Sequence, residues 1–375
     1  MNTKEALIAI NLLPQLGPIR LRRLLEVFGT PQRVLSAKAF ELQRVRGIGE
    51  QVVGTLLKWE EQVDLQGELR RIQELGAQVI VEEDEDYPSL LREIYDPPIV
   101  LYALGKLEAR DRNAIGIVGS RRTTIYGCET ARKFAYQLAS SGLTIVSGLA
   151  RGIDTEAHQA ALAAKGRTIA VVGSGLGNIY PEENHALAER IATSGAVLSE
   201  FPIQTRPDKR TFPMRNRIIS GMSQSLLVVE AGLKSGALIT ANQATEQNRT
   251  VYAVPGPIDR ESSAGCNRLI QEGAKLVVNA ADILDDMSYL IQISGLPQSK
   301  PEKSLKKTSA SQACRSIELS EKEQKIYDAL DGGELFIDEI TQKTQLPSGA
   351  VSSTLLTLEM KSIVKQLPGK HFRRV

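Results

Sequence analysis

Cysteine and histidine are scarce in this sequence, and their positions exclude the usual disulfide and metal sites. The three cysteines lie far apart in the chain, so they form neither a disulfide framework nor a C-x-x-C zinc knuckle. The three histidines match neither H-x-x-x-H nor H-E-x-x-H, so a zinc or di-iron site would depend on carboxylates alone. We therefore expect a reducing compartment and no metal or other cofactor. The residues concerned are Cys128, Cys266, Cys314, His158, His185 and His371.

Long apolar runs and a strong net charge are also missing. The 46 lysines and arginines nearly balance the 44 aspartates and glutamates, so any basic surface has to be local. Asn11 and Pro14 break the first apolar run, which fits neither a signal peptide nor a membrane span. We expect a soluble cytoplasmic protein. The length of 375 residues, with 42% hydrophobic side chains, fits two or three globular domains.

Residues 1–66 contain a repeated helical pattern. Gly17 precedes an amphipathic run, and the same arrangement returns at Gly47 and Gly49. The pattern is typical of helix-hairpin-helix motifs, whose glycine-rich turns can aim backbone N–H groups at a phosphate. The alternative is a small helical domain whose glycines only form tight turns. We predict a double helix-hairpin-helix, SAM-like domain.

Residues 67–287 then alternate short apolar runs with segments of helical periodicity, several of them closed by a glycine such as Gly142 or Gly166. This alternation predicts an α/β fold, an extended Rossmann-like, doubly wound parallel sheet with helices on both faces. Ligands of such sheets bind at the carboxyl ends of the strands. The expected strands are 79–81, 99–104, 114–118, 144–146, 168–172, 196–198, 226–229, 251–254 and 276–278, with a helix at 88–94 between the first two.

The last part of the chain follows a different pattern. Residues 288–316 carry prolines, lysines and serines, which predicts a flexible linker. Residues 317–375 begin with a helix capped by Ser320, continue through two more helical segments and end in two short strands around Pro368. Three helices followed by a hairpin are typical of a winged-helix domain, which can bind duplex DNA or a protein.

Five turns of the expected sheet hold small residues, and several lead directly into a helix. Free N–H groups at a helix start favour anions, so together these turns predict an anion-binding rim. Neither G-x-G-x-x-G nor the P-loop pattern occurs, which argues against a dinucleotide or nucleoside triphosphate site. The turns lie at 119–122, 147–152, 173–177, 230–236 and 255–256.

A short proline-bounded stretch, residues 207–217, combines four cations with one aromatic ring. Phosphates would satisfy Lys209, Arg210, Arg215 and Arg217, and a base can stack on Phe212. We interpret this stretch as a polyanion-binding loop.

The structural alternative for this stretch is that Phe212 fills the core and that Arg217 pairs internally with Glu200 or Glu230. Hydrolytic groups are a further alternative, because Asp154 and His158 lie four residues apart and Glu230 follows a strand. A serine nucleophile lacks its G-x-S-x-G context. We instead expect Asp154 to be the N-cap of its helix and His158 to bond internally.

Taken in order, these motifs resemble the DprA (DNA-processing protein A, also called Smf) family. The resemblance covers about residues 77–287. It rests on Gly119-Ser120-Arg121, Tyr126-Gly127, Ser147-Gly148, Gly152-Ile153-Asp154 with His158, Tyr180-Pro181 with Asn184, Ser199-Glu200, Phe212-Pro213 with Arg215-Asn216-Arg217, Val229-Glu230-Ala231, Ser235-Gly236 with Thr240-Ala241, and Pro255-Gly256.

The resemblance implies a protein that binds and protects single-stranded DNA and loads the RecA recombinase onto it during natural transformation, without chemical turnover. It also implies a homodimer formed through the core. The implied DNA-binding residues are Gly119, Ser120, Arg121, Ser147, Gly148, Lys209, Phe212, Arg215, Arg217, Ser235 and Gly236.

Two other functions stay open at this point. The same sheet with Glu230 at a strand end also resembles nucleotide phosphoribohydrolases, although their P-G-G-x-G-T-x-x-E pattern is missing after Pro255 and Gly256. The third hypothesis is a transcription regulator that acts through residues 317–375, with the core as its ligand sensor.

Overall fold

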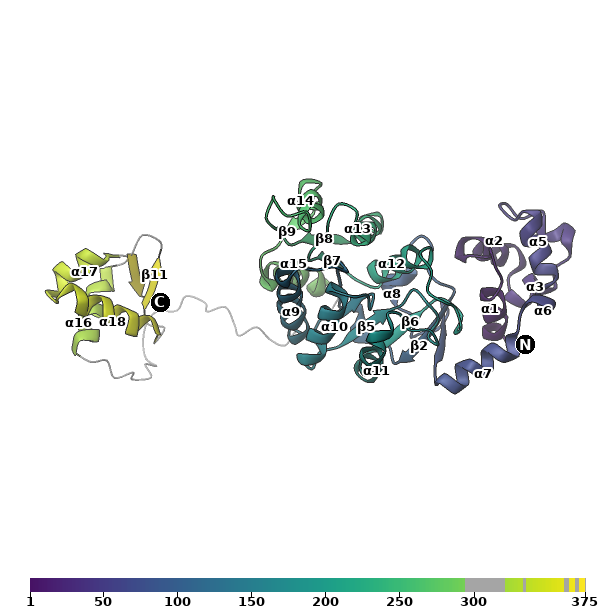
Figure 1. The fold of residues 1–375 in the computed structure, drawn as a ribbon, viewed down its shortest axis with the longest axis horizontal. Helices are drawn as coiled ribbons and strands as arrows, with labels where there is room; N and C mark the ends of the chain where they lie inside the picture. Colours follow the sequence, from purple (N-terminus) through teal and green to yellow (C-terminus); the bar gives the residue numbers. More distant parts are fainter. Residues whose placement is uncertain (294–320, 333–334, 361–363, 368–370, 375) are drawn as a thin grey trace. The chain divides into compact units, whose positions relative to one another are not determined.

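The computed structural model describes residues 1–293, 321–332, 335–360, 364–367 and 371–374. The chain forms two compact units, Met1–Gln298 and Ser299–Val375 (Figure 1). The first unit holds the helical N-terminal region and the large sheet. The second holds the small C-terminal domain. Most of the expected linker, from residue 294 on, lies outside the described residues.

A nine-stranded sheet organises the first unit, in the order β1-β2-β6-β5-β4-β3-β7-β8-β9. The seven strands from β6 to β9 are parallel, as expected, whereas β2 runs antiparallel to β6 and β1 antiparallel to β2. From β3 the strand order proceeds through β4, β5 and β6 on one side, and β7, β8 and β9 follow on the other side of β3. The carboxyl ends of β3 and β7 therefore flank the switch point of the sheet. The strands are β1 Gln78–Val81, β2 Val100–Gly105, β3 Ala114–Val118, β4 Thr144–Ser147, β5 Thr168–Val171, β6 Ala196–Ser199, β7 Ser225–Val228, β8 Thr250–Ala253 and β9 Lys275–Leu276.

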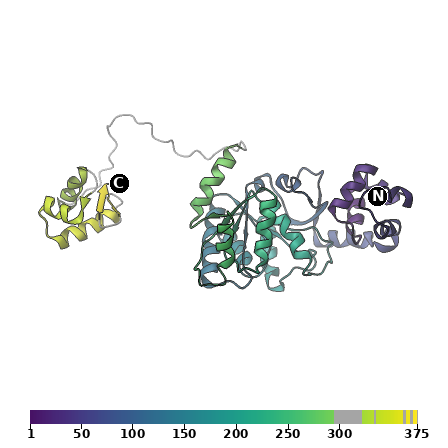
Figure 2. The same cartoon turned by 90° about the horizontal axis from the view of Figure 1, so that it is seen from above.

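Helices cover both faces of this sheet because its strands are apolar on both sides (Figures 1 and 2). On one face, α9 and α10 pack Phe134 and Ile153 against Ile115 and Ile145. On the other, α12 and α13 pack against the opposite sides of β3 and β7. The bounds are α8 Ser89–Arg92, η1 Ala109–Arg112, α9 Ile125–Ser140, α10 Ile153–Ala163, η2 Glu182–Asn184, α11 His185–Ser194, α12 Thr211–Gly221, α13 Gly236–Glu246, α14 Ala264–Gln271 and α15 Ala280–Ile293.

Among the expected boundaries that differ in the structure, two concern helices of the core, α10 and α15. The helix expected to start at the N-cap Asp154 instead has Gly152 as its N-cap and Ile153 as its first residue. Gly152 adopts φ +76°, and a Cβ there would lie 2.3 Å from the Ser120 carbonyl oxygen, so glycine is required. The other difference is α15, whose last six residues, 288–293, are helical rather than part of the expected linker.

The N-terminal region consists of short helices that pack onto the β1–β2 end of the sheet. Its apolar cluster includes Ile10 and Leu24 as well as Tyr102 of β2. Gly17 and Gly49 are the N-caps of α2 and α5, where the repeated pattern placed new helices. The helices are α1 Thr3–Asn11, α2 Pro18–Phe28, α3 Pro31–Ser36, α4 Ala39–Leu42, α5 Glu50–Leu57, α6 Trp59–Gln62 and α7 Leu65–Leu75, which crosses the expected boundary at 66.

The C-terminal unit has the winged-helix arrangement that the sequence predicts. Three helices surround an apolar cluster that includes Ile340 and Leu355, and a three-stranded sheet in the order β10-β12-β11 packs against them. The elements are α16 Glu321–Ala329, η3 Leu330–Gly332, β10 Leu335–Phe336, α17 Ile337–Thr344, α18 Ser348–Met360, β11 Val364–Leu367 and β12 His371–Arg374.

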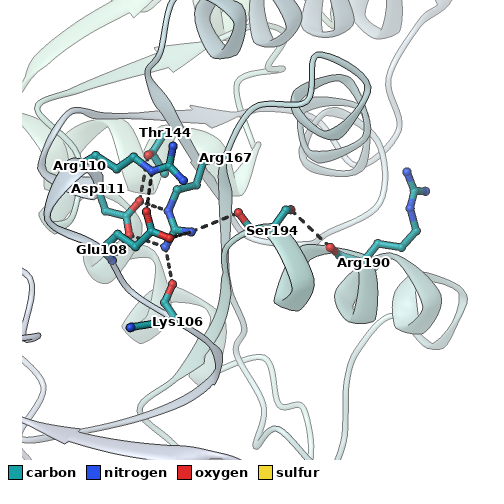
Figure 3. Close-up of polar contacts among 8 residues, drawn as sticks. All are labelled: Lys106, Glu108, Arg110, Asp111, Thr144, Arg167, Arg190 and Ser194. Carbon is teal, nitrogen blue, oxygen red and sulfur yellow. Dashed lines mark hydrogen bonds and ion pairs between the residues drawn. The ribbon is translucent and has the colours of Figure 1, made fainter.

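A buried ion-pair cluster closes the amino end of the parallel sheet (Figure 3). The Arg167 guanidinium, 7% exposed, donates to both carboxylate oxygens of Asp111 at 2.5 and 2.8 Å. It also donates to the backbone carbonyls of Lys106 and Ser194. Asp111 accepts a further hydrogen bond from the Thr144 hydroxyl. The charges of this cluster are satisfied by internal partners, so the cluster stabilises the amino edge of the sheet. A ligand is expected at the opposite, carboxyl edge.

Candidate nucleic-acid interface

A cleft of about 850 Å³ lies at the carboxyl ends of β3 and β7, at the switch point of the sheet. The two loops that flank it are joined by a backbone hydrogen bond from Ser120 N–H to the Glu230 carbonyl at 2.7 Å. Its lining includes the turn after β3, the start of α12 and the turn before α13. The lining includes Gly119, Ser120, Arg121, Arg122, Asp154, Lys209, Phe212, Arg215, Lys234, Ser235, Gly236, Ala237 and Glu261.

Glu230 fixes the loop after β3 rather than facing the cleft as a free acid. One carboxylate oxygen accepts from the Thr123 hydroxyl at 2.6 Å and from the Thr124 N–H at 2.9 Å, and the other accepts from the Thr124 hydroxyl. Burial raises the pKa of Glu230, but these hydrogen bonds outweigh it, so its pKa lies below the ordinary value. Glu230 therefore stays ionised and holds the loop that carries Arg121.

The aromatic ring of Phe212 lies on the cleft with a cation above it. The Arg121 guanidinium carbon is 4.7 Å from the ring centroid, and the centroid of the Tyr180 ring is 5.9 Å from it. Phe212 is half-buried and belongs to none of the hydrophobic core clusters. The alternative of a core-filling residue is therefore wrong, and the ring is placed where a base could stack on it.

Four exposed cations line the cleft without an acidic ion-pair partner among the residues that the structure describes. They differ from Arg210, which pairs with Asp208 at 2.9 Å. Cations that outnumber the carboxylates of the same cleft, here Asp154 and Glu261, attract a polyanion. The four are Arg121, Arg122, Lys209 and Lys234.

Arg215 supplies a fifth charge from beneath the cleft. Its side chain is only 3% exposed, and Nη1 donates to the Val171 carbonyl at 2.6 Å, while Nε has no partner within the described parts of the chain. Burial lowers the pKa of Arg215 to about 10, so the guanidinium remains positive at neutral pH. The attraction of Asp154, whose own pKa burial raises, partly offsets that cost.

Arg217 is not a cleft residue, contrary to the prediction. It forms ion pairs with Glu200 at 2.6 Å and Asp96 at 3.0 Å, and its side chain is 7% exposed. The expectation that it could pair internally with Glu200 is confirmed. A guanidinium held between two carboxylates has no charge left to offer a phosphate.

Three other predicted phosphate donors, Ser120, Ser147 and Gly148, are also occupied. The Ser120 N–H donates to the Glu230 carbonyl, and its hydroxyl donates to the Arg122 carbonyl at 2.9 Å. The Ser147 hydroxyl donates to the Ile117 carbonyl at 2.6 Å, and the Gly148 N–H donates to Asp154 Oδ2 at 3.1 Å. Ser147 and Gly148 are also buried. These donors are therefore not available to a ligand.

Helix α13 opens onto the same cleft. Ser235 is its N-cap, and the Ser235 hydroxyl accepts from the Ala237 N–H at 3.3 Å. Ser235, Gly236 and Ala237 all line the cleft, so the positive end of the helix dipole adds to its basic character.

Sequence reasoning did not assign three side chains to this site. Arg122 and Lys234 line the cleft, and Tyr180 contacts the Phe212 ring. The sequence does contain a signal for the two cations, because Arg122 and Lys234 lie inside two of the turns that form the predicted anion-binding rim.

The described residues contain neither a candidate metal site nor a helix that could span a membrane. His158 is fully buried, and its Nδ1 lies 2.7 Å from the Thr168 hydroxyl oxygen, which confirms the expected internal bond. No cluster of three or more potential metal-binding side chains occurs in the described residues. Nor does any described helix have the length and apolarity needed to cross a bilayer.

A doubly wound sheet with a basic, aromatic-lined cleft at its switch point, followed in the chain by a winged helix, defines a Rossmann-like protein suited to a polyanionic ligand. Residues 78–288 match the family model "DNA recombination-mediator protein A", and residues 310–370 match "DprA winged helix domain". The chain belongs to this DprA/Smf family.

Named relatives support that membership. "Protein Smf" of Synechocystis is 36% identical over 96% of this chain and 95% of the relative, and "DNA processing protein DprA" of Bacillus subtilis is 46% identical over 58% and 74%. The X-ray structure of DprA from Streptococcus pneumoniae superposes with a TM-score of 0.67 at 36% identity, covering 76% of this chain and 98% of that one. A Helicobacter pylori DprA structure, described by its single-stranded DNA binding mode, matches with a TM-score of 0.51 at 30% identity, covering 56% and 96%.

Proposed function

We propose that this protein binds single-stranded DNA in the switch-point cleft, with its cations on phosphates and Phe212 under a base. The observation that carries the proposal is the grouping of Arg121, Arg122, Lys209 and Lys234, without ion-pair partners in the described structure, around that half-buried ring. Phosphates supply the missing counter-charge, and stacking accepts any base, so binding should be largely independent of sequence. The single-stranded DNA binding named for the Helicobacter pylori structure supports the same ligand.

The role we propose is binding without chemical turnover. Two acids at the base of the cleft are engaged: Glu230 by two threonines, and Asp154 by the N–H groups of Gly148 and Ala150. A general acid or base needs a free position within reach of a substrate, and these two carboxylates are used to hold loops. The remaining acid of the lining, Glu261, is exposed at its rim.

Equilibrium binding to labelled oligonucleotides tests the proposal. The full chain should bind single-stranded DNA more tightly than blunt duplex of the same length, with and without a chelator. Equal affinity for the duplex, or loss of binding with the chelator, would contradict it. Stronger binding to duplex through the C-terminal unit would instead favour the transcription-regulator hypothesis.

We also propose that the protein loads RecA onto the bound strand in natural transformation, as its family membership suggests. Faster RecA filament assembly on DNA that carries a single-strand-binding protein is the expected result. A filament assay that shows no effect of added protein would contradict this role.

A homodimer completes the proposal. Leu276, Val278 and Ile258 are 47%, 61% and 97% exposed, and all three lie on or follow the last two strands of the sheet. An apolar sheet edge of this kind favours pairing with a second copy. Light scattering after size exclusion should give twice the mass of the chain. A monomer at micromolar concentration would contradict it.

A further inference from the structure

A second, smaller cavity of about 180 Å³ adjoins the cleft at Phe212. It shares Arg121, Arg122 and Phe212 with the cleft but adds Tyr180 and Arg151. The Arg121–Phe212 stack is thus a common wall of the two spaces. A DNA strand that crosses this wall would place one nucleotide in each of the two spaces.

Tyr180 is suited to receive a base in this second space. Its side chain is 39% exposed, and its ring makes an angle of 48° with the Phe212 ring at a centroid distance of 5.9 Å. One planar base cannot lie parallel to two rings tilted by that angle. The two rings can therefore serve two successive bases, which turn relative to each other between them.

The charges around the two rings favour a phosphate at the wall that the two spaces share. Arg151 is paired with Glu183 through two hydrogen bonds of 2.8 Å, and this pairing raises the pKa of Arg151. Arg121 and Arg122, which line both spaces, form no ion pair within the described residues. The free charge thus lies at the shared wall rather than at the outer end of the small cavity.

We propose that Tyr180 forms a second base-stacking subsite, in which the nucleotide next to the one on Phe212 binds with their linking phosphate on Arg121 and Arg122. The ligand is a single-stranded oligonucleotide, so the inference rests on the proposed function. The subsite extends the strand path from the switch point toward the start of α10 and the η2 turn, which neighbour Tyr180 in the structure.

The test compares Tyr180→Ala, Tyr180→Phe and the control Tyr136→Ala. Tyr136 is 49% exposed on α9 and lines neither space. Each variant is titrated with oligothymidine of about four and about sixteen nucleotides at several salt concentrations. Tyr180→Ala should weaken binding of the longer strand roughly five- to a hundredfold without changing the salt slope, because stacking releases no counterions. Tyr180→Phe keeps the ring and should bind like the unaltered chain.

The control variant separates this subsite from a general defect. A strand of about four nucleotides still spans Phe212 and Tyr180, so Tyr180→Ala should weaken its binding by a similar factor, whereas Tyr136→Ala should leave the affinity for both strands within about twofold. Equal affinity of Tyr180→Ala and Tyr136→Ala for the longer strand would overturn the subsite, as would a loss in Tyr180→Phe as large as in Tyr180→Ala. If the unaltered chain bound neither strand, the proposed function itself would fail, which is a separate result.

Discussion

At the scale of single residues, Gly148 shows how tightly the charges beneath the cleft are packed. A Cβ at this position would lie 1.9 Å from Arg215 Nη1 and 2.7 Å from Asp154 Oδ2. The side chains would have to move, since real Cβ atoms do not approach so closely. Gly148 therefore contributes space for Arg215 rather than a donor to DNA.

We predict that Gly148→Ala lowers single-stranded DNA affinity about tenfold or more by displacing Arg215, a charge-assisted contact of about 1.5–3 kcal/mol. Fluorescence anisotropy with a labelled oligonucleotide measures the change. Gly54→Ala is the matched control, because a Cβ there meets nothing within 4 Å. Identical affinities of the two variants would contradict this account of Arg215.

His158 predicts a pH effect on stability. The Thr168 hydroxyl donates to the Ile145 carbonyl, so His158 Nδ1 is the donor to Thr168, and Nε2 has no partner among the described groups. Burial lowers the pKa of His158 from 6.5 to about 3. The unfolded chain therefore binds a proton between these pH values that the folded chain does not, and stability present above pH 6.5 is lost as the pH falls.

The free energy of unfolding in urea should accordingly fall faster on acidification for the unaltered protein than for His158→Gln, which cannot titrate. The difference in slope should approach about 1.4 kcal/mol per pH unit between pH 6 and pH 4. Parallel curves for the two proteins would show that His158 does not remain neutral in the folded state.

The sequence predicts which residue types form the site better than it predicts where their side chains point. The cation-rich stretch 207–217 and the family resemblance both assign Arg215 and Arg217 to DNA, and the stretch is expected to be a loop. The structure has helix α12 from Thr211, and side chains two positions apart on a helix point to different sides. Arg215 thus faces the cleft, whereas Arg217 faces Glu200, a distant residue that spacing alone could not identify.

At the scale of elements, Arg217 connects three parts of the first unit. Its ion pairs join α12 to Glu200 after β6 and to Asp96 before β2. Removing one partner from a buried ion pair leaves uncompensated charge and costs about 3–5 kcal/mol. The residue therefore stabilises the position of α12 rather than binding the ligand.

We predict that Arg217→Met lowers the free energy of unfolding by about that 3–5 kcal/mol, while the folded fraction binds single-stranded DNA with unchanged salt dependence. Urea unfolding and a salt titration measure the two quantities. Lys209→Met is the matched control and should show the reverse pattern. A reduced salt slope with unchanged stability in Arg217→Met would restore it to the DNA site.

The order of strands and helices could be predicted because buried strands and helices differ in length and periodicity. The antiparallel direction of β1 and β2 could not be predicted, because an apolar run has the same pattern in a parallel and in an antiparallel strand. Tertiary packing decides the direction of such a strand. Helix α15 extends past the expected end for a local reason. The first glycine and proline after it are Gly295 and Pro297, so nothing in 288–293 ends the helix.

At the scale of the whole molecule, the division into two units predicts the effect of truncation. All the cleft residues belong to Met1–Gln298. Removing residues 310–375 should leave this unit folded and change its single-stranded DNA affinity by less than about tenfold, or about 1.4 kcal/mol. Melting temperature and anisotropy measure both effects. Loss of most binding would move the main DNA site to the winged helix.

The salt dependence of single-stranded DNA binding tests the central claim most directly. If each free cation lies on a phosphate, Arg121→Ala, Lys209→Ala and Lys234→Ala should each reduce the slope of log K against log salt by about 0.7. Phe212→Ala should instead weaken binding by about 1–3 kcal/mol with the slope nearly unchanged. Such a result would place the strand in the switch-point cleft. An unchanged slope in all three cation variants would contradict that placement.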